Sequence, residues 1–183
     1  MPYRKVPLVA GEFYHVFNRS IAKQPIFMNK GDYKRLLALT EYYRYKNPPV
    51  RYSYYINRTA EQQQVLRQNH PAFSNPLVKI LAYCIMPNHF HFLLQPILDN
   101  GISDFVRNVS HSYSKYFNIK YKRTGSIVQS MFHAIHIETT DQLLHVSRYI
   151  ISTLQLHTSS NLKLYLCILG LHFLIMYLTI NHL

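Results

Sequence analysis

The chain has 183 residues, a length that suits a single domain able to bury its own hydrophobic core. Hydrophobic residues make up 48% of the sequence, and only five residues are glycine and nine are proline, which excludes disordered, linker-like and collagen-like chains. Twenty lysines and arginines against eight acidic residues leave a formal net charge of +12. A basic surplus of this size favours a polyanionic partner, most simply nucleic acid.

The two cysteines and the ends of the chain bear on its compartment. Cys84 and Cys167 lie far apart in apolar runs, so we expect buried thiols of a cytoplasmic protein rather than a disulfide framework or a zinc site. The first ten residues lack the apolar stretch of a signal peptide. Residues 164–180 carry no formal charge, but Gly170 and His172 near their middle argue against insertion into a bilayer. No membrane partner is therefore expected.

The sharpest change of composition falls near residue 160, because all eight acidic residues precede it. We therefore expect a folded domain over residues 1–155 and an apolar C-terminal tail over residues 156–183. The tail could be the product of a frameshift, a segment docked on the sheet or a membrane segment, and the sequence leaves these alternatives open.

The first half of the domain alternates a strand with a helix. Phe13, His15 and Phe17 recur at period two, which predicts a strand over residues 12–19. Apolar residues at three- and four-residue spacing predict a helix over residues 32–46, ended by a pair of prolines. The polar residues 51–75 show no such spacing, and we expect a loop there.

The second half continues the alternation. Apolar runs over residues 78–86 and 89–95 meet at a Pro-Asn turn, which predicts an antiparallel hairpin. A helix is predicted from Ser103, taken as its N-cap, to residue 122, then a strand over residues 131–138 and a helix from a capping box at 139–142. This order predicts an α+β sandwich of the ferredoxin-like or RRM-like kind, an antiparallel sheet with its helices on one face.

A histidine pair lies on the second strand of the predicted hairpin. Residues two apart in a strand point to the same side, so His89 and His91 present two imidazoles on one face. Two imidazoles at this spacing can share a metal ion, although a half-exposed strand can carry such a pair without any ligand.

The residues around this pair resemble a known family. Residues 86–94, Met-Pro-Asn-His-Phe-His-Phe-Leu-Leu, are similar to the histidine–hydrophobe–histidine signature of the single-tyrosine HUH transposases, in particular the REP-associated tyrosine transposases. Four further blocks resemble that family in the same order, so that the similarity extends over roughly residues 5–151. They are residues 11–19, residues 116–118 with 123–126, residues 132–138 and residues 143–150.

The resemblance implies a metal-dependent enzyme that binds single-stranded DNA, often beside a hairpin, and cleaves it by tyrosine attack. The products would be a 5′-phosphotyrosine and a free 3′-hydroxyl, as steps in DNA transposition or REP-element mobilisation. A phenol with an ordinary pKa of ~10 is a weak nucleophile, and a divalent cation would favour its phenolate and polarise the phosphate. The cofactor implied is Mg²⁺ or Mn²⁺.

Helical geometry and the resemblance point to the same one of the sixteen tyrosines, although an exposed or interface tyrosine without a catalytic role stays the alternative. Tyr149 projects from the predicted last helix on the side opposite to its apolar face, and the resemblance assigns the nucleophile to the same residue. The family commonly has an Asn or Gln as third metal ligand one turn later, where this chain has Thr153. Gln155 and His145 are the other candidates.

Five basic residues are expected to contact DNA: Arg19, Lys115, Lys120, Lys122 and Arg123. Two further alternatives stay open. The site could form within one chain or across a homodimer, and the chain could be a catalytically impaired remnant that only binds DNA.

Overall fold

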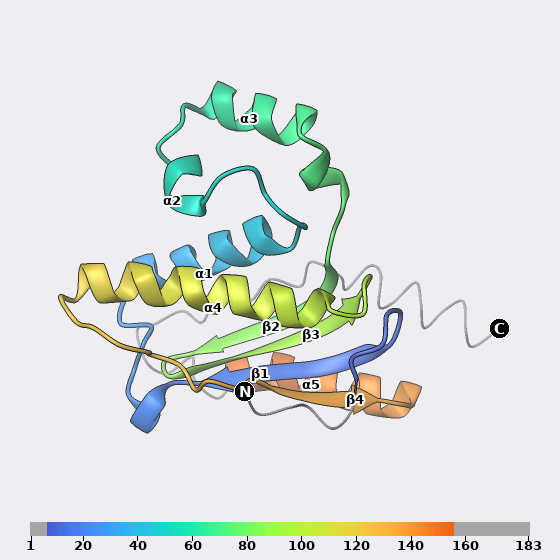
Figure 1. Cartoon of the computed structure of the whole chain (residues 1–183). Helices are drawn as coiled ribbons and strands as arrows, with labels where there is room; N and C mark the ends of the chain where they lie inside the picture. The colour runs from blue at the N-terminus through green and yellow to red at the C-terminus, as the bar shows by residue number, and fades with distance from the viewer. Residues whose placement is uncertain (1–6, 156–183) are drawn as a thin grey trace.

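The computed structural model describes the backbone of residues 7–155 and the side chains of residues 7–150. Its centre is a four-stranded antiparallel sheet in the order β2-β3-β1-β4, formed by β1 (Phe13–Arg19), β2 (Val78–Met86), β3 (His89–Pro96) and β4 (His133–Ile137) (Figure 1). The predicted hairpin is confirmed, with Pro87 and Asn88 between its strands. The apolar tail lies outside the described residues, so the expectations about it stay predictions.

Two long helices cover one face of the sheet. α1 (Lys30–Tyr43) and α4 (Gly101–Lys120) pack on each other and on the sheet, and side chains at alternate strand positions, such as Tyr14 and Val16, enter the core between them. Because β1 and β2 are both antiparallel to β3, they run parallel to each other, as in the split βαβ unit of ferredoxin-like folds. The predicted α+β class and antiparallel sheet are confirmed.

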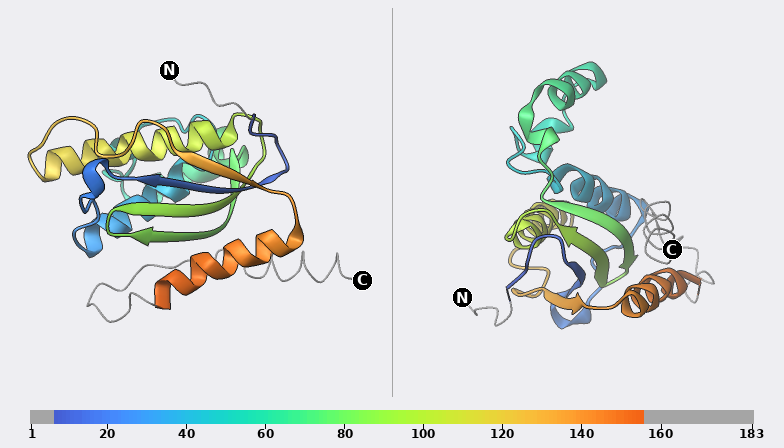
Figure 2. Two further views of the ribbon diagram at one scale, coloured as in Figure 1. Left: turned by 90° about the horizontal axis from the view of Figure 1, so that it is seen from below. Right: turned by 90° about the vertical axis from the view of Figure 1, so that its right-hand side faces the viewer.

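The last helix of the domain corrects the expectation that all helices lie on one face of the sheet. α5 (Thr140–Gln155) crosses the opposite face of the sheet from α1 and α4 (Figure 2). Its residues Leu143 and Ile150 join a second, smaller hydrophobic cluster with Cys84 and Leu93 of the hairpin strands. Alternate residues of β3 therefore enter two different cores. The prediction of an apolar face on the last helix is confirmed. Periodicity does not indicate which side of the sheet that helix covers.

The segment predicted to be a loop is partly helical, which corrects the reading of residues 51–75. It contains α2 (Tyr52–Tyr55), α3 (Ala60–Asn69) and the short 3₁₀ turn η2 (Pro71–Ser74), which stand on the outer side of α1 (Figure 1). α3 has a capping box between Thr59 and Gln62 but no buried residue, so its sequence lacks the apolar periodicity that predicts a helix.

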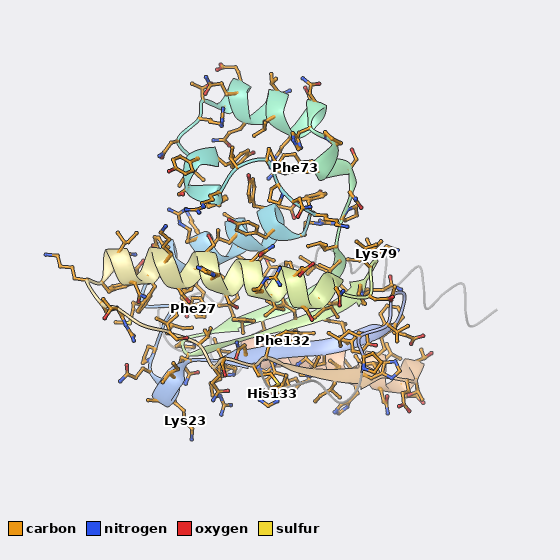
Figure 3. The ribbon with its side chains drawn as sticks, in the orientation of Figure 1. Lys23, Phe27, Phe73, Lys79, Phe132 and His133 are labelled. Carbon is orange, nitrogen blue, oxygen red and sulfur yellow. The ribbon has the colours of Figure 1, made fainter. Side chains whose placement is uncertain are left out.

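Aromatic contacts attach this segment to α1. The Tyr42 ring lies 4.8 Å from that of Tyr55 and 5.8 Å from that of Phe73, and Arg67 donates a hydrogen bond to the Tyr55 hydroxyl. Tyrosines of the segment that the sequence predicts to be a polar loop thus belong to a packed aromatic cluster. Figure 3 shows Phe73 between α3 and the helices α1 and α4 that cover the sheet.

The ends of the two covering helices are joined by an ion pair whose carboxylate is buried. Asp32, at the third position of α1, accepts hydrogen bonds from Lys120 at 2.6 Å and from the hydroxyls of Tyr116 and Tyr121. Burial alone would raise the pKa of the Asp32 carboxyl, but these bonds and the Met28 amide together lower that pKa below its ordinary value. The pair therefore fixes the start of α1 against the end of α4.

The described part of the chain also bears on the membrane question. Within residues 7–155, none of the helices combines the length and the apolar character that crossing a bilayer requires.

Candidate active site

The sheet face that α5 crosses carries a group of histidine and aromatic rings. β1 pairs with β3 in a register that places Phe17 opposite His91 and Arg19 opposite His89, so residues 74 and 70 positions apart become neighbours on one face. The side chains of Val16 and Phe92 enter the core on the other side of the sheet. The strand alternation therefore places both histidines on one face, as the sequence predicts, and the fold turns that face toward α5.

His15 of β1 makes a direct contact with the predicted metal ligand His91. Its Nε2 atom lies 2.9 Å from Nδ1 of His91, and both side chains are buried. Burial lowers the pKa of His15. Burial first, and then the nearby His15, His89 and Arg19, lower the pKa of His91 to about 3. Both rings are therefore neutral near pH 7, so one donates its single N–H to the other.

The buried nitrogen of His91 fits a metal ligand. Nε2 of His91 has no hydrogen-bond partner among the described residues, and a buried unpartnered nitrogen is costly unless something binds it. If Nε2 offers its lone pair to a cation, Nδ1 must carry the proton and donate it to His15. An acceptor of this kind commonly orients metal-bound histidines.

The second histidine is held by its neighbour in the turn. The side-chain nitrogen of Asn88 donates to the carbonyl of Lys23 at 3.0 Å, so its oxygen faces Nδ1 of His89 at 2.6 Å. Nδ1 of His89 is then the donor, and Nε2 carries the lone pair. The rings of His89 and His91 lie 5.0 Å apart at 77°. Asn88 thus sets His89 in the tautomer that suits a cation, and His91 has the matching tautomer when His15 accepts its Nδ1–H.

The predicted nucleophile lies beside these rings. The Tyr149 ring of α5 is 6.0 Å from the His91 ring and 6.3 Å from the His15 ring, edge-on to both. Its side chain is 47% exposed, although neighbouring Ile150 is fully buried against the sheet. The contact between α5 and the hairpin therefore brings Tyr149 to the histidine pair from the same chain.

Among the side chains of residues 7–150, the structure brings no third ligand to this pair. Thr153 and Gln155 belong to α5, but their side chains lie outside the described residues, and His145 is exposed on an earlier turn. No group of three or more His, Cys, Asp or Glu side chains suited to a metal ion occurs within residues 7–150. The residues present fit a two-imidazole part of a cation site, and the third ligand stays a prediction.

The exposed part of this face extends to the edge strand. His133 of β4 stacks on Phe17 with ring centroids 4.9 Å apart and an angle of 14° between the planes, and Phe17 also contacts His91 at 5.4 Å. Figure 3 shows His133 on the side of the sheet away from α4. A row of planar rings thus runs from the histidine pair toward the outer edge of the sheet.

The five basic residues expected to contact DNA fall into different places. Arg19 lies beside the histidine pair, whereas Lys115 and Lys120 belong to α4 on the other side of the sheet. Lys122 and Arg123 follow in the loop after α4, where the Arg123 guanidinium lies over the Phe117 ring at 5.7 Å. The sequence alone does not show this division.

The pattern of the family described as "Transposase IS200 like" matches residues 50–153, more than half of the chain. This chain belongs to the IS200-like transposase family. The resemblance noted from the histidine pair and its flanking blocks is therefore confirmed at the level of that family. No curated protein matches the chain.

Two solved structures are similar to this transposase. A REP-associated tyrosine transposase bound to a REP hairpin matches 86% of this chain and 74% of its own, with 16% identity and a TM-score of 0.54. A putative transposase from Deinococcus radiodurans covers 83% of this chain and 96% of its own, with 13% identity and a TM-score of 0.43. The first of these likenesses supports the observed α+β fold.

Sequence reasoning missed the residues that orient the pair in this transposase. His15 was read only as part of a strand, and Asn88 only as part of a turn. The clue to Asn88 is its position directly before His89, since an adjacent amide can reach the ring. His15 lies 76 residues from His91, and only the pairing of β1 with β3 joins them.

Proposed function

We propose that this transposase cleaves single-stranded DNA by attack of the Tyr149 hydroxyl on a phosphodiester, and that it transfers the strand in DNA transposition or REP-element mobilisation. The phenolic oxygen bonds to phosphorus, the bond from phosphorus to the 3′-oxygen breaks, and the phenolic proton is lost. The products are a 5′-phosphotyrosine and a free 3′-hydroxyl. The observation that carries this proposal is the placement of Tyr149 against His91 and His15 in one chain.

Each neighbouring side chain has a role in the proposal. His89 and His91 would hold a divalent cation, Mg²⁺ or Mn²⁺, while His15 and Asn88 keep both imidazoles in the required tautomer. Such a cation, when bound, polarises the phosphate and favours the phenolate. Arg19, opposite His89 in the sheet, supplies a positive charge for the phosphate on the same face. The half-exposed Tyr149 ring can reach a substrate from solvent.

The DNA partner follows from charge and from the related structure. A net charge of +12 suits a polyanion, and the similar REP-associated transposase is bound to a REP hairpin. We therefore propose that the substrate is single-stranded DNA next to a hairpin. The exposed ring of His133, stacked on the partly buried ring of Phe17, gives unpaired bases a surface to stack on beside the site.

The test is covalent capture of the cleaved strand. Single-stranded oligonucleotides with a flanking hairpin are incubated with the protein and Mn²⁺ or Mg²⁺, and a denaturing gel reports a protein–DNA adduct. We expect an adduct with the wild-type chain and its loss in Tyr149→Phe, because the variant lacks the attacking oxygen. Tyr54→Phe is the matched control, since Tyr54 is an exposed tyrosine of α2.

Two outcomes would contradict the proposal. An adduct that survives Tyr149→Phe would assign the nucleophile to another tyrosine. DNA binding by the wild-type chain without any adduct would favour the alternative of a catalytically impaired remnant, for which Thr153 in place of an amide ligand is the motivating observation.

A further inference from the structure

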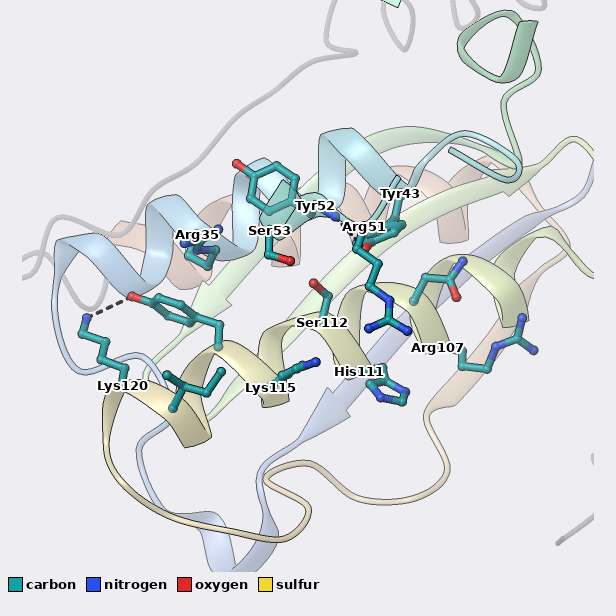
Figure 4. A pocket seen from close by; sticks show the side chains of 13 residues that line it. Arg35, Tyr43, Arg51, Tyr52, Ser53, Arg107, His111, Ser112, Lys115 and Lys120 are labelled. Atoms are coloured by element: carbon teal, nitrogen blue, oxygen red, sulfur yellow. Dashed lines mark hydrogen bonds between the residues drawn. The ribbon is translucent and has the colours of Figure 1, made fainter. Parts of the chain in front are cut away.

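A basic groove lies on the outer side of α1 and α4, away from the sheet face that carries the histidine pair and Tyr149. It has a volume of about 720 Å³ and is bordered by α1, by the start of α2 and by α4 (Figure 4). Five cationic side chains from α1, from α4 and from the residue directly before α2 line it: Arg35, Arg51, Arg107, Lys115 and Lys120. Cations from separate elements converge here only because the chain folds α2 back over α1.

The cations of the groove differ in what they already contact. Lys120 forms the ion pair with buried Asp32, and Arg107 pairs with Asp104 at 2.7 Å. Within the described side chains, Arg35, Arg51 and Lys115 form no ion pair, and Arg51 and Lys115 are exposed. The groove therefore holds positive charge that the protein's own carboxylates leave uncompensated, which favours an anionic ligand.

Two tyrosines of the groove, Tyr52 and Tyr116, contact two of its cations. The Arg35 guanidinium lies 4.6 Å from the centre of the Tyr116 ring and 5.2 Å from that of Tyr52, and the Lys120 ammonium lies 5.4 Å from the Tyr116 ring. Rings covered by cations have less surface for stacking on bases. The Arg35 guanidinium, fixed in this way, suits phosphate oxygens, which carry no base identity.

From these contacts we propose that the groove between α1, α2 and α4 binds the phosphodiester backbone of a second segment of the DNA whose other segment enters the Tyr149 site. The inference rests on the proposed function for its substrate. α1 and α4 cover one face of the sheet and α5 the other, so the two sites lie on opposite sides of the sheet (Figure 2). A DNA molecule that occupies both must pass the edge of the sheet.

The groove would thus anchor DNA by charge, without reading its sequence and without touching the reacting phosphate. The backbone can belong to the duplex stem of a hairpin or to a single strand, because both present the same phosphodiester anions. Each phosphate contact releases counterions, so binding through this groove weakens as salt rises.

The experiment measures binding separately from cleavage. Fluorescence anisotropy is recorded for a labelled hairpin and for a labelled single strand of scrambled sequence, at several salt concentrations, with EDTA present and in the Tyr149→Phe background. The test variant adds Arg51→Gln and Lys115→Gln. The control adds Lys46→Gln and Arg58→Gln, two exposed cations that do not line the groove. Thermal melting of both variants reports whether they are folded.

We expect the groove variant to bind at least one probe roughly tenfold or more weakly at low salt, with a salt slope smaller by about 2, since two phosphate contacts are lost. Weakening of the hairpin alone assigns the groove to the duplex stem, and weakening of the single strand alone assigns it to an unpaired segment. Affinity and slope equal to those of the control for both probes would overturn the proposal.

This design keeps the two proposals separable. The binding measurement needs neither a divalent cation nor the Tyr149 hydroxyl, so a wild-type chain that forms no covalent adduct would leave the result on the groove unchanged. If the double variant melts well below the control, the single change Lys115→Glu, on an exposed side of α4, repeats the test.

Discussion

His15 and His91 share one hydrogen bond, and the direction of that bond decides what Nε2 of His91 can do. If His15 accepts, Nε2 of His91 carries a lone pair, and a cation is its natural partner. We expect His15→Phe to weaken Mn²⁺ binding by ~10–100-fold, because the Nδ1–H of His91 loses its acceptor. Isothermal titration calorimetry with Mn²⁺ measures this without any DNA. His15→Gln, which restores an acceptor oxygen, should recover part of the affinity, and equal binding by all three proteins would refute the assigned role.

At the scale of the element, the start of α4 shows how a helix boundary is set by a neighbouring segment. A Cβ on Gly101 would lie 2.3 Å from the carbonyl oxygen of Leu77, so only glycine allows the helix to begin there. We expect Gly101→Ala to lower the free energy of unfolding by about 1–3 kcal/mol, measured by urea denaturation, because backbone must move to admit the methyl group.

Ser103, predicted as the N-cap, lies inside the helix, whose N-cap is Asn100. Ser103→Ala should therefore change stability little, and a loss as large as that of a missing cap, about 1 kcal/mol, would argue for the later start.

At the scale of the whole molecule, buried neutral histidines make stability depend on pH. Unfolded His91 takes up a proton below its ordinary pKa of 6.5, whereas the folded chain does so only near 3. The unfolded state therefore binds more protons between these values, and the free energy of unfolding should fall as pH drops through that interval. His15, with its pKa also lowered, acts in the same direction, and Asp32 adds a further loss below its ordinary value of 3.8.

The slope of the free energy of unfolding against pH can be traced to His91 with a variant. The contribution of His91 can approach ~1.4 kcal/mol per pH unit, and His91→Gln should remove it. Denaturation in EDTA at pH 4 to 7 compares the two proteins, and only the slope matters, so an overall loss of stability in the variant does not obscure the result. Parallel curves for wild type and variant would show that His91 is not the titrating group.

Much of this molecule could be predicted from local patterns. The alternation of Phe13, His15 and Phe17, the Pro87-Asn88 turn and the apolar face of α5 each depend on residues close together in the chain, and periodicity reports such geometry directly. Where a pattern was weak, prediction was wrong: α3 buries none of its residues and leaves no periodic trace.

By itself the sequence predicted the order of the four strands and of α1, α4 and α5, the shared face of His89 and His91 and the basic character of the chain, and it nominated Tyr149 as the nucleophile. Only the tertiary structure decided that β1 lies between β3 and β4, which brings His15 to His91, and that α5 crosses the face opposite α1 and α4. The groove of Arg35, Arg51 and Lys115 likewise arises from three separate elements. The physical reason is range, because side-chain spacing within a segment fixes the face that each residue shares, whereas strand order and helix placement depend on packing between distant segments.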